Sequence, residues 1–197
     1  GIAGEWYGTM ENCATINVSV DGSNPHGLIG YGGTATNSYT TYPDVCTPGG
    51  TVIVNCYGKN ELAENDYTSG KLCFMLNLGL ATPAWFQNLD SDQYPVPSSS
   101  HSVVYASEVR CDGSLLEGAF FTNDTSQCKE RPSHKYNGIL CEECGTMDPD
   151  YTCQEEDGYY LIAKNGLYGI IDLDGLQILK PEWKSITAIV GGYVVCK

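Results

Sequence analysis

Basic side chains are scarce in this sequence, and their scarcity excludes several classes of partner. The 197 residues include 10 Lys and Arg against 24 Asp and Glu, a formal net charge of −14. So few cations cannot replace the counterions of DNA or RNA, which excludes a nucleic-acid-binding protein, and anionic membrane surfaces are disfavoured for the same reason. Long apolar runs are also missing: none reaches the roughly 18 residues that a membrane-spanning helix needs, so we expect no membrane insertion.

Recognisable catalytic motifs are missing as well. The sequence has no G-x-S-x-G elbow, and His26, His101 and His134 are expected to be loop or metal-binding residues. Glycosidases and lyases built on β-helices need clustered carboxylates, often with a basic residue, yet Lys59 is the only cation before Lys71. The sequence therefore predicts a protein that is not an enzyme. A fragment of a polysaccharide-degrading β-helix enzyme is the least favoured alternative.

The composition nevertheless indicates a folded protein, because 42% of the residues are hydrophobic. Low Lys content and abundant Gly, Asn, Ser, Thr and Tyr favour an extracellular bacterial protein. The chain begins without Met and without a signal-type apolar stretch, so we expect it to be a segment of a longer protein.

Three segments near the start share a repeat that runs from Gly-Thr through a short β-prone stretch to Asn and then Cys or Ser. The repeat ends at Cys13, Ser38 and Cys56, which are 25 and 18 residues apart. This spacing predicts parallel rungs of a β-solenoid with these three side chains stacked inside the coil.

The repeat and the segment His26-Gly27-Leu28-Ile29-Gly30-Tyr31 resemble the Gly-Leu-x-Gly (GLUG-type) repeats of large surface proteins of gut bacteria. The resemblance covers about residues 5–112. It implies a right-handed parallel β-helix and a location at the cell surface.

A short helix is expected to close the end of this solenoid. Within residues 69–78, Ser69 can cap the helix, and Leu72, Met75 and Leu76 share one face. The aromatic residues Trp85 and Phe86 follow, and we expect them to pack beneath the cap. The alternative is a glycan- or protein-binding module that uses solenoid or cap aromatics, with Trp6, Trp85 and Phe86 as candidate binding residues.

Cysteine and histidine form the strongest chemical pattern. Cys141-Glu142-Glu143-Cys144-Gly145 is a C-x-x-C-G knuckle whose two thiolates can converge on one tetrahedral ion. His134 supplies a third ligand, and either Cys111 or Cys128 supplies the fourth. Together, Cys111-Asp112-Gly113, His134 and the knuckle resemble the small Cys/His module that follows these surface repeats, which implies Cys111. Four protein ligands leave no open position, so the expected zinc is structural.

Two other uses of the cysteines stay open. Disulfides, such as one between Cys128 and Cys153, suit an oxidising environment, and the thiols can also be free. A redox-active knuckle is disfavoured because Glu142 and Glu143 raise the thiol pKa. The acidic residues from Glu142 to Asp157 are expected to form a solvated linker rather than a calcium site.

The C-terminal residues show hairpin patterns. Asn165-Gly166 and Asp174-Gly175 separate β-prone runs, with Pro181 expected to end the third strand, so residues 159–195 are predicted to form an antiparallel meander. Residues 157–197 resemble the WG (KWG) repeat, with Tyr168 at the usual place of Trp.

The expected fold is all-β: a short right-handed parallel β-helix with a small helical cap, then an antiparallel β-meander. We expect solenoid rungs over 1–68, a capping segment over 69–110, the Cys/His knuckle and acidic linker over 111–156, and the WG-like module over 157–197. The expected function is that of a non-enzymatic structural or adhesive module of a cell-surface repeat protein. Its expected partners are host or bacterial surface glycans or proteins.

Overall fold

The computed structural model describes residues 2–5, 7–21, 25–46, 51–156, 158–190 and 193–196. The chain divides into two units: unit 1 comprises Gly1–Val109 and Gly113–Arg131, and unit 2 comprises Arg110–Asp112 and Pro132–Lys197. Short strands make up both units and a single α-helix lies among the described residues, so the protein is all-β. No helix of the described residues has the length and apolar character to cross a membrane.

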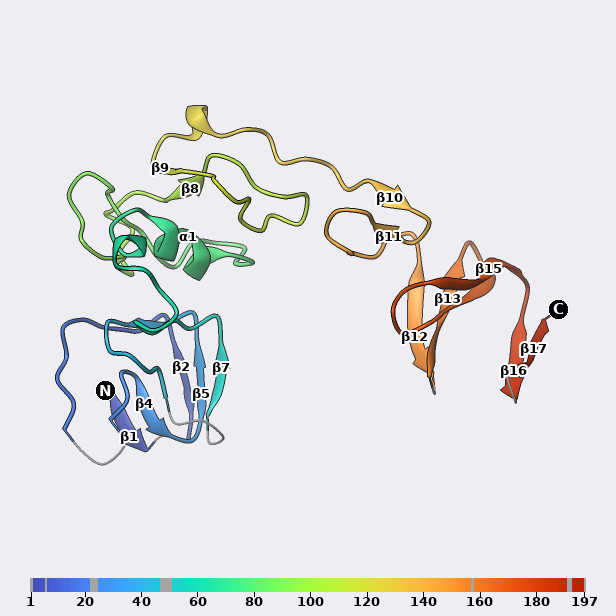
Figure 1. Ribbon diagram of the computed structural model, residues 1–197, viewed down its shortest axis with the longest axis horizontal. Coiled ribbons are helices and arrows are strands. Elements are labelled where there is room, and N and C mark those ends of the chain that lie inside the picture. The colour runs from blue at the N-terminus through green and yellow to red at the C-terminus, as the bar shows by residue number, and fades with distance from the viewer. Residues whose placement is uncertain are drawn as a thin grey trace. The chain divides into compact units, whose positions relative to one another are not determined.

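The described strands of residues 2–60 form parallel pairs (Figure 1). Strand β1 (Ala3–Glu5) pairs with β4 (Ile29–Tyr31), and β3 (Ala14–Thr15) pairs with β6 (Tyr39–Thr40). Strands β2 (Thr9–Glu11), β5 (Thr34–Thr36) and β7 (Val52–Val54) form a parallel three-stranded sheet in that order. The parallel pairing is the one that the repeat predicts.

The asparagine of the repeat turns the chain in the same way each time. Asn12, Asn37 and Asn55 have φ values of 51°, 47° and 53°, the left-handed conformation that Asn tolerates better than most residues. The Asn55 side-chain amide donates to Asn37 Oδ1 at 2.9 Å, which links successive turns. Of the residues that follow, Ser38 is fully buried, as expected, whereas Cys13 and Cys56 are half-buried.

Strand β7 lies at the edge of its sheet, and no described strand pairs with its outer side. Its three residues are β-branched, and all three are exposed, with Val52 at 60%, Ile53 at 49% and Val54 at 54%. The sheet therefore ends in an apolar edge.

Helix α1 (Lys71–Asn77) lies where the sequence predicts it, but its cap differs. Gly70 is the N-cap residue, with φ of 90°, and Ser69 makes only a long contact, 3.4 Å from its Oγ to the Lys71 N–H. Glycine is needed here because a Cβ at residue 70 would lie 2.7 Å from Leu89 Cδ2. The expectation of a serine cap is wrong.

The core of unit 1 joins α1 to the parallel strands. Leu72, Cys73 and Leu76 of α1 pack with Tyr39 of β6 and with Trp85, all fully buried. Two short elements follow in the remainder of unit 1: the antiparallel pair β8 (Tyr105–Ala106) and β9 (Phe121–Thr122), and a 3-10 turn at Thr125–Gln127.

Unit 2 contains an antiparallel sheet in the order β12 (Thr152–Glu156), β13 (Tyr159–Lys164), β14 (Leu167–Ile171), β15 (Gln177–Trp183). Two separate hairpins flank it in sequence: β10 (Tyr136–Asn137) with β11 (Leu140–Cys141), and β16 (Ile186–Val190) with β17 (Tyr193–Cys196). The predicted antiparallel meander is confirmed over β13, β14 and β15, whereas β16 and β17, which fall within the same predicted range, form a sheet of their own.

The hairpin turns follow from local chemistry. Asn165 and Gly166 both have positive φ, 54° and 76°, as the two-residue turn between β13 and β14 requires. At the second turn the Asp172 carboxylate accepts hydrogen bonds from the N–H groups of Asp174 and Leu176 at 3.0 and 2.7 Å. Asp172 is thus a turn-forming residue, as expected.

Two expectations about unit 2 are wrong. The acidic segment expected as a linker contains strand β12, which pairs with β13 over five residues. Pro181 does not end the third strand, because β15 is the edge of the sheet, where a missing N–H is tolerated, and its register shifts beside Gly169. A Cβ at residue 169 would lie 2.5 Å from the Leu179 carbonyl oxygen, so this close approach requires glycine.

Candidate metal centre

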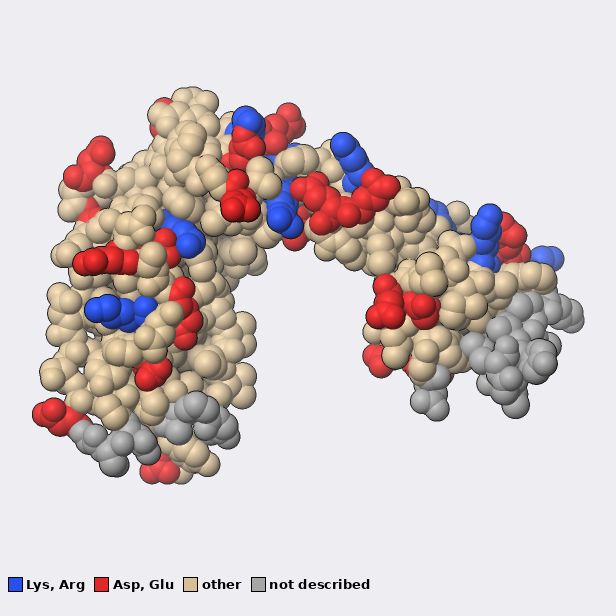
Figure 2. Space-filling view, viewed as in Figure 1, with Lys and Arg blue, Asp and Glu red and all other residues tan. Residues whose placement is uncertain are grey.

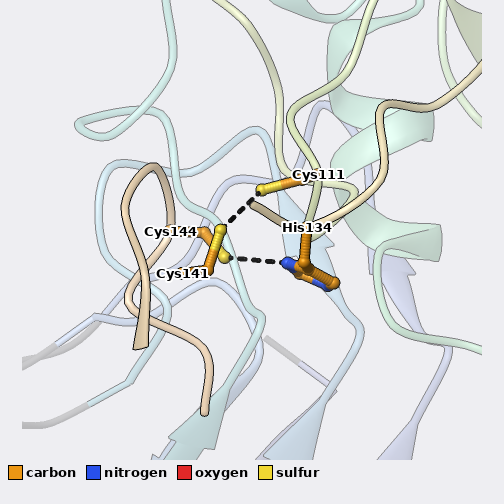
Figure 3. Close-up of side chains that lie close together, drawn as sticks. All are labelled: Cys111, His134, Cys141 and Cys144. Carbon is orange, nitrogen blue, oxygen red and sulfur yellow. Dashed lines mark hydrogen bonds between the residues drawn. The ribbon is translucent and has the colours of Figure 1, made fainter. Parts of the chain in front are cut away.

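The four residues that the sequence predicts as ligands lie together in unit 2 (Figure 3). One donor atom from each of Cys111, His134, Cys141 and Cys144 lies within 4.8 Å of the other three. The cluster spans three separate stretches of chain, so its formation depends on the fold and not on the knuckle alone.

The β10–β11 hairpin and the turn that follows it position the two knuckle thiols. Cys141 is the last residue of β11; its N–H donates to the Thr146 carbonyl at 2.8 Å, and its carbonyl accepts from the Gly145 N–H at 2.9 Å. Gly145 has φ of 70°, a conformation that a residue with a Cβ rarely adopts. The glycine after the second cysteine therefore closes the turn that carries both thiols.

The donor separations suit a tetrahedral ion. Cys111 Sγ lies 3.6 Å from Cys141 Sγ, and Cys144 Sγ lies 3.3 Å from His134 Nδ1. A tetrahedron with zinc–ligand bonds of the usual length has S–S edges of about 3.8 Å and S–N edges of about 3.6 Å. These two edges are within a few tenths of an ångström of the tetrahedral values, and all four donor atoms lie within 4.8 Å of one another, so the cluster can hold a metal ion.

The surroundings of Cys141 and Cys111 shift the pKa values of their thiols in opposite directions. Burial raises the pKa of Cys141, but hydrogen bonds from the backbone N–H groups of Cys144 and Glu143, and from His134, outweigh burial and lower that pKa below its ordinary value. For Cys111, burial and the neighbouring thiols of Cys144 and Cys141 raise the pKa. Of these two thiols, Cys141 therefore has the environment that favours the thiolate form, whereas the sequence predicts a raised pKa for the knuckle thiols.

No disulfide links the nine cysteines whose side chains the structure describes. The separation of 3.6 Å between Cys111 and Cys141 sulfurs is far longer than the roughly 2.05 Å of an S–S bond. Cys128, the reserve candidate for the fourth ligand, belongs to unit 1, where its Sγ lies 3.9 Å from the Asp124 carbonyl oxygen. Cys153 is exposed on β12 and is not part of the cluster.

Sequence analysis missed the contacts that attach the knuckle segment to the sheet of unit 2. Lys164, the last residue of β13, places its Nζ 3.3 Å from both Asp148 Oδ2 and Asp150 Oδ2 and 4.5 Å from the Tyr151 ring centroid. Two of the acidic residues expected to be solvated are therefore ion-paired. Charge spacing alone gave no sign of this pairing, because Lys164 approaches through the fold.

The three aromatic residues considered as candidate binding residues are not brought together as the metal ligands are. Trp85 is fully buried, its ring lies 5.3 Å from that of Tyr39, and its Nε1 donates to the Asn37 carbonyl at 2.8 Å. It cannot present a face to a ligand, so its expected packing role is observed and its assignment as a binding residue is wrong. Phe86 is half-buried and pairs through its backbone with Val96, and Trp6 lies outside the described residues.

One further polar cluster in unit 1 contains groups that can serve in catalysis. His101 Nδ1 lies 2.6 Å from Asp92 Oδ2, but the neighbouring Ser102 hydroxyl donates to Asn88 Oδ1 at 2.9 Å, not to the imidazole. Asn88 in turn holds the loop, since its N–H donates to Asp92 Oδ2 at 2.6 Å. These contacts fix a loop and leave the serine without a base.

The chain matches no protein-family model, no curated protein and no solved structure.

Proposed function

We propose that this chain is a non-enzymatic structural or adhesive module of an extracellular, cell-surface bacterial protein, and that a structural zinc ion cross-links its second unit. The Cys/His cluster carries the proposal. A site with three thiols and one imidazole from protein alone fills a tetrahedral coordination shell and leaves no position for substrate.

Zinc is the metal that this donor set favours. Thiolate and imidazole are softer ligands than the oxygen donors that calcium and magnesium prefer, and a tetrahedral S₃N arrangement is typical of zinc. Asp148 and Asp150, the first acidic residues after the knuckle, are paired with Lys164, so they are not free to favour a harder cation.

For unit 1, we propose that the parallel strands are the last rungs of a right-handed β-helix of the GLUG type. Support comes from the in-register parallel pairs, the recurring left-handed asparagine and the stacked Cys, Ser and Cys positions. The packing of α1 against Tyr39 is what a cap requires. The WG-like character of unit 2 rests on its Asn165-Gly166 hairpin and the following strands.

Elemental analysis and a free-thiol count on the purified chain test the zinc proposal. We expect one zinc per chain, lost in Cys144→Ser and retained in the matched variant Cys153→Ser, whose thiol is exposed and outside the cluster. Absence of stoichiometric zinc, with Cys141 or Cys144 found in a disulfide by mass mapping, would show that the segment is a disulfide staple instead.

A further inference from the structure

A pocket of about 670 Å³ lies in unit 1, where the ends of the parallel strands meet the segment that precedes α1. We propose that this pocket binds a neutral oligosaccharide. The proposal is independent of the zinc site, because every residue that lines the pocket belongs to unit 1. The volume is within the usual 300–1,000 Å³ range of small-ligand sites.

One wall of the pocket is a row of side chains from successive parallel strands. Asn17 follows β3, Thr41 follows β6, and Lys59 follows the bridge between Tyr39 and Tyr57. The Asn17 N–H donates to Thr41 Oγ1 at 2.7 Å, and the Lys59 N–H donates to the Tyr42 carbonyl at 2.9 Å. Backbone hydrogen bonding thus fixes the spacing of this wall before any ligand arrives.

The apolar part of the pocket is preformed. Leu62 and Tyr67 are buried, and the half-buried ring of Tyr94 meets Tyr67 edge to face with centroids 5.7 Å apart. The Tyr67 hydroxyl donates to the Thr40 carbonyl at 3.3 Å, which fixes its ring. Tyr94 therefore offers a partly exposed aromatic surface on a rigid support, and the C–H face of a sugar ring packs well on such a surface.

The polar part consists of amides. Asn17, Asn65 and Gln93 line the pocket, and their side-chain amides make no hydrogen bond to another described residue. Each amide supplies two donors and one acceptor, which matches a ligand that carries many hydroxyl groups. The carbonyl of Asn65 accepts from the Ser69 N–H at 2.9 Å, so its backbone is held while its amide stays available.

The charges favour a neutral ligand. Lys59 and Glu64 contribute one positive and one negative side chain to the lining, so the pocket itself has no excess of either sign. The chain carries a net charge of −14, and Figure 2 shows acidic side chains dispersed over the visible face of unit 1 with basic ones sparse among them. This field repels phosphates and acidic polysaccharides.

Affinity electrophoresis against soluble neutral polysaccharides (mannan, xylan, mixed-linkage β-glucan and galactan), followed by calorimetry with oligosaccharides of the retained polymer, tests the proposal. We expect retention by at least one. The double variant Asn65→Ala/Gln93→Ala should weaken that binding at least tenfold without shifting the unfolding transition, because both residues are exposed. Gln154→Ala, an exposed amide in unit 2, is the matched control and should bind unchanged.

Three results would overturn the proposal: no retention by any neutral polymer, equal affinity of the double variant and the unaltered chain, or retention by acidic polymers such as alginate alone. Binding should also persist after chelation of metal, and its loss would place the site elsewhere. A chain that binds sugar but contains no zinc would refute the zinc proposal and leave this one intact.

Discussion

The two units stabilise their β-strands by different means. Unit 1 fully buries Trp85, Tyr39, Leu72 and Leu76 in one cluster, to which α1 contributes a whole face. In unit 2 the buried cluster among the described side chains is small: Ile139, Ile162 and Ile171, with Met147, Tyr151 and Tyr160 partly covering it.

The difference in buried apolar surface indicates which part of the chain needs a cross-link to stay folded. A short loop-rich segment that buries little apolar surface cannot offset the conformational entropy lost on folding. Residues 132–151 are such a segment, and the Cys/His cluster and the Lys164 ion pairs lie within it or against it. In unit 1 the burial of large aromatic side chains can offset the entropy lost on folding without a cross-link.

The largest expected effect is that removal of the proposed zinc unfolds part of unit 2 and leaves unit 1 folded. In small zinc-dependent peptides, metal binding contributes about 10–16 kcal/mol to folding, so chelation should unfold residues 132–151 while unit 1 stays folded. Limited proteolysis with mass mapping checks this, and new cuts should appear only in that segment. Cys153→Ser should behave as the unaltered chain does, whereas simultaneous cutting within unit 1 would contradict the comparison.

Loss of the largest buried ring should destabilise unit 1 and leave unit 2 unaffected. Trp85→Ala removes a fully buried side chain and its hydrogen bond to Asn37, and we expect it to destabilise unit 1 by about 3–5 kcal/mol. Peptide-resolved hydrogen exchange should show faster exchange in α1 and β6 with unit 2 unaffected. The control is Trp183→Ala, since Trp183 is 38% exposed on the edge strand β15 and should cost far less.

Alanine substitutions at two glycines of unit 2 should compare the cost of steric overlap with the cost of backbone strain. Gly169→Ala forces a Cβ against the backbone of β15, which we expect to cost about 3 kcal/mol. At Gly166, where φ is 76° and nothing lies within 4 Å of an added Cβ, alanine meets only the left-handed strain of about 1 kcal/mol. Denaturant midpoints of unit 2 measure both, and equal losses would contradict the register of β14 and β15.

The smallest expected effect is the pH dependence of one loop in unit 1. Burial raises the pKa of Asp92, but hydrogen bonds from the Asn88 N–H and His101 outweigh it, so the pKa lies below its ordinary value. Its stabilising contribution is present above the unfolded-state pKa of about 3.9 and is lost as pH falls through the lowered folded-state value. Asp92→Asn should therefore lower the urea midpoint at pH 7, and the deficit should shrink as pH falls below about 3.9.

The parts of the molecule that the sequence predicts are those set by local chemistry. The C-x-x-C-G knuckle needs only a tight turn, Asn165-Gly166 needs only its own backbone preference, and α1 needs only one apolar face. The parallel pairing follows from a repeat whose asparagine adopts one unusual conformation three times.

What sequence analysis missed depends on residues brought together from a distance. Nothing near Pro181 shows that Gly169 lets β15 continue past it, and nothing near Asp148 shows that Lys164 pairs with it. A tryptophan such as Trp85 suits either a core position or a ligand-binding surface, and only its contact with Tyr39 decides between the two roles. The amide-lined pocket joins side chains as far apart as Asn17 and Gln93, so no sequence window contains it.

The exposed edge of β7 has a consequence for how the protein behaves in concentrated solution. Val52, Ile53 and Val54 present an apolar strand with unpaired backbone groups, the kind of template on which β-rich chains coagulate. At neutral pH the charge of −14 keeps molecules apart by colloidal repulsion, and neutralising the carboxylates removes this barrier while the edge persists. The acidic surface thus sets the solubility limit of the fold: acidified or salted preparations should turn turbid well before the chains unfold.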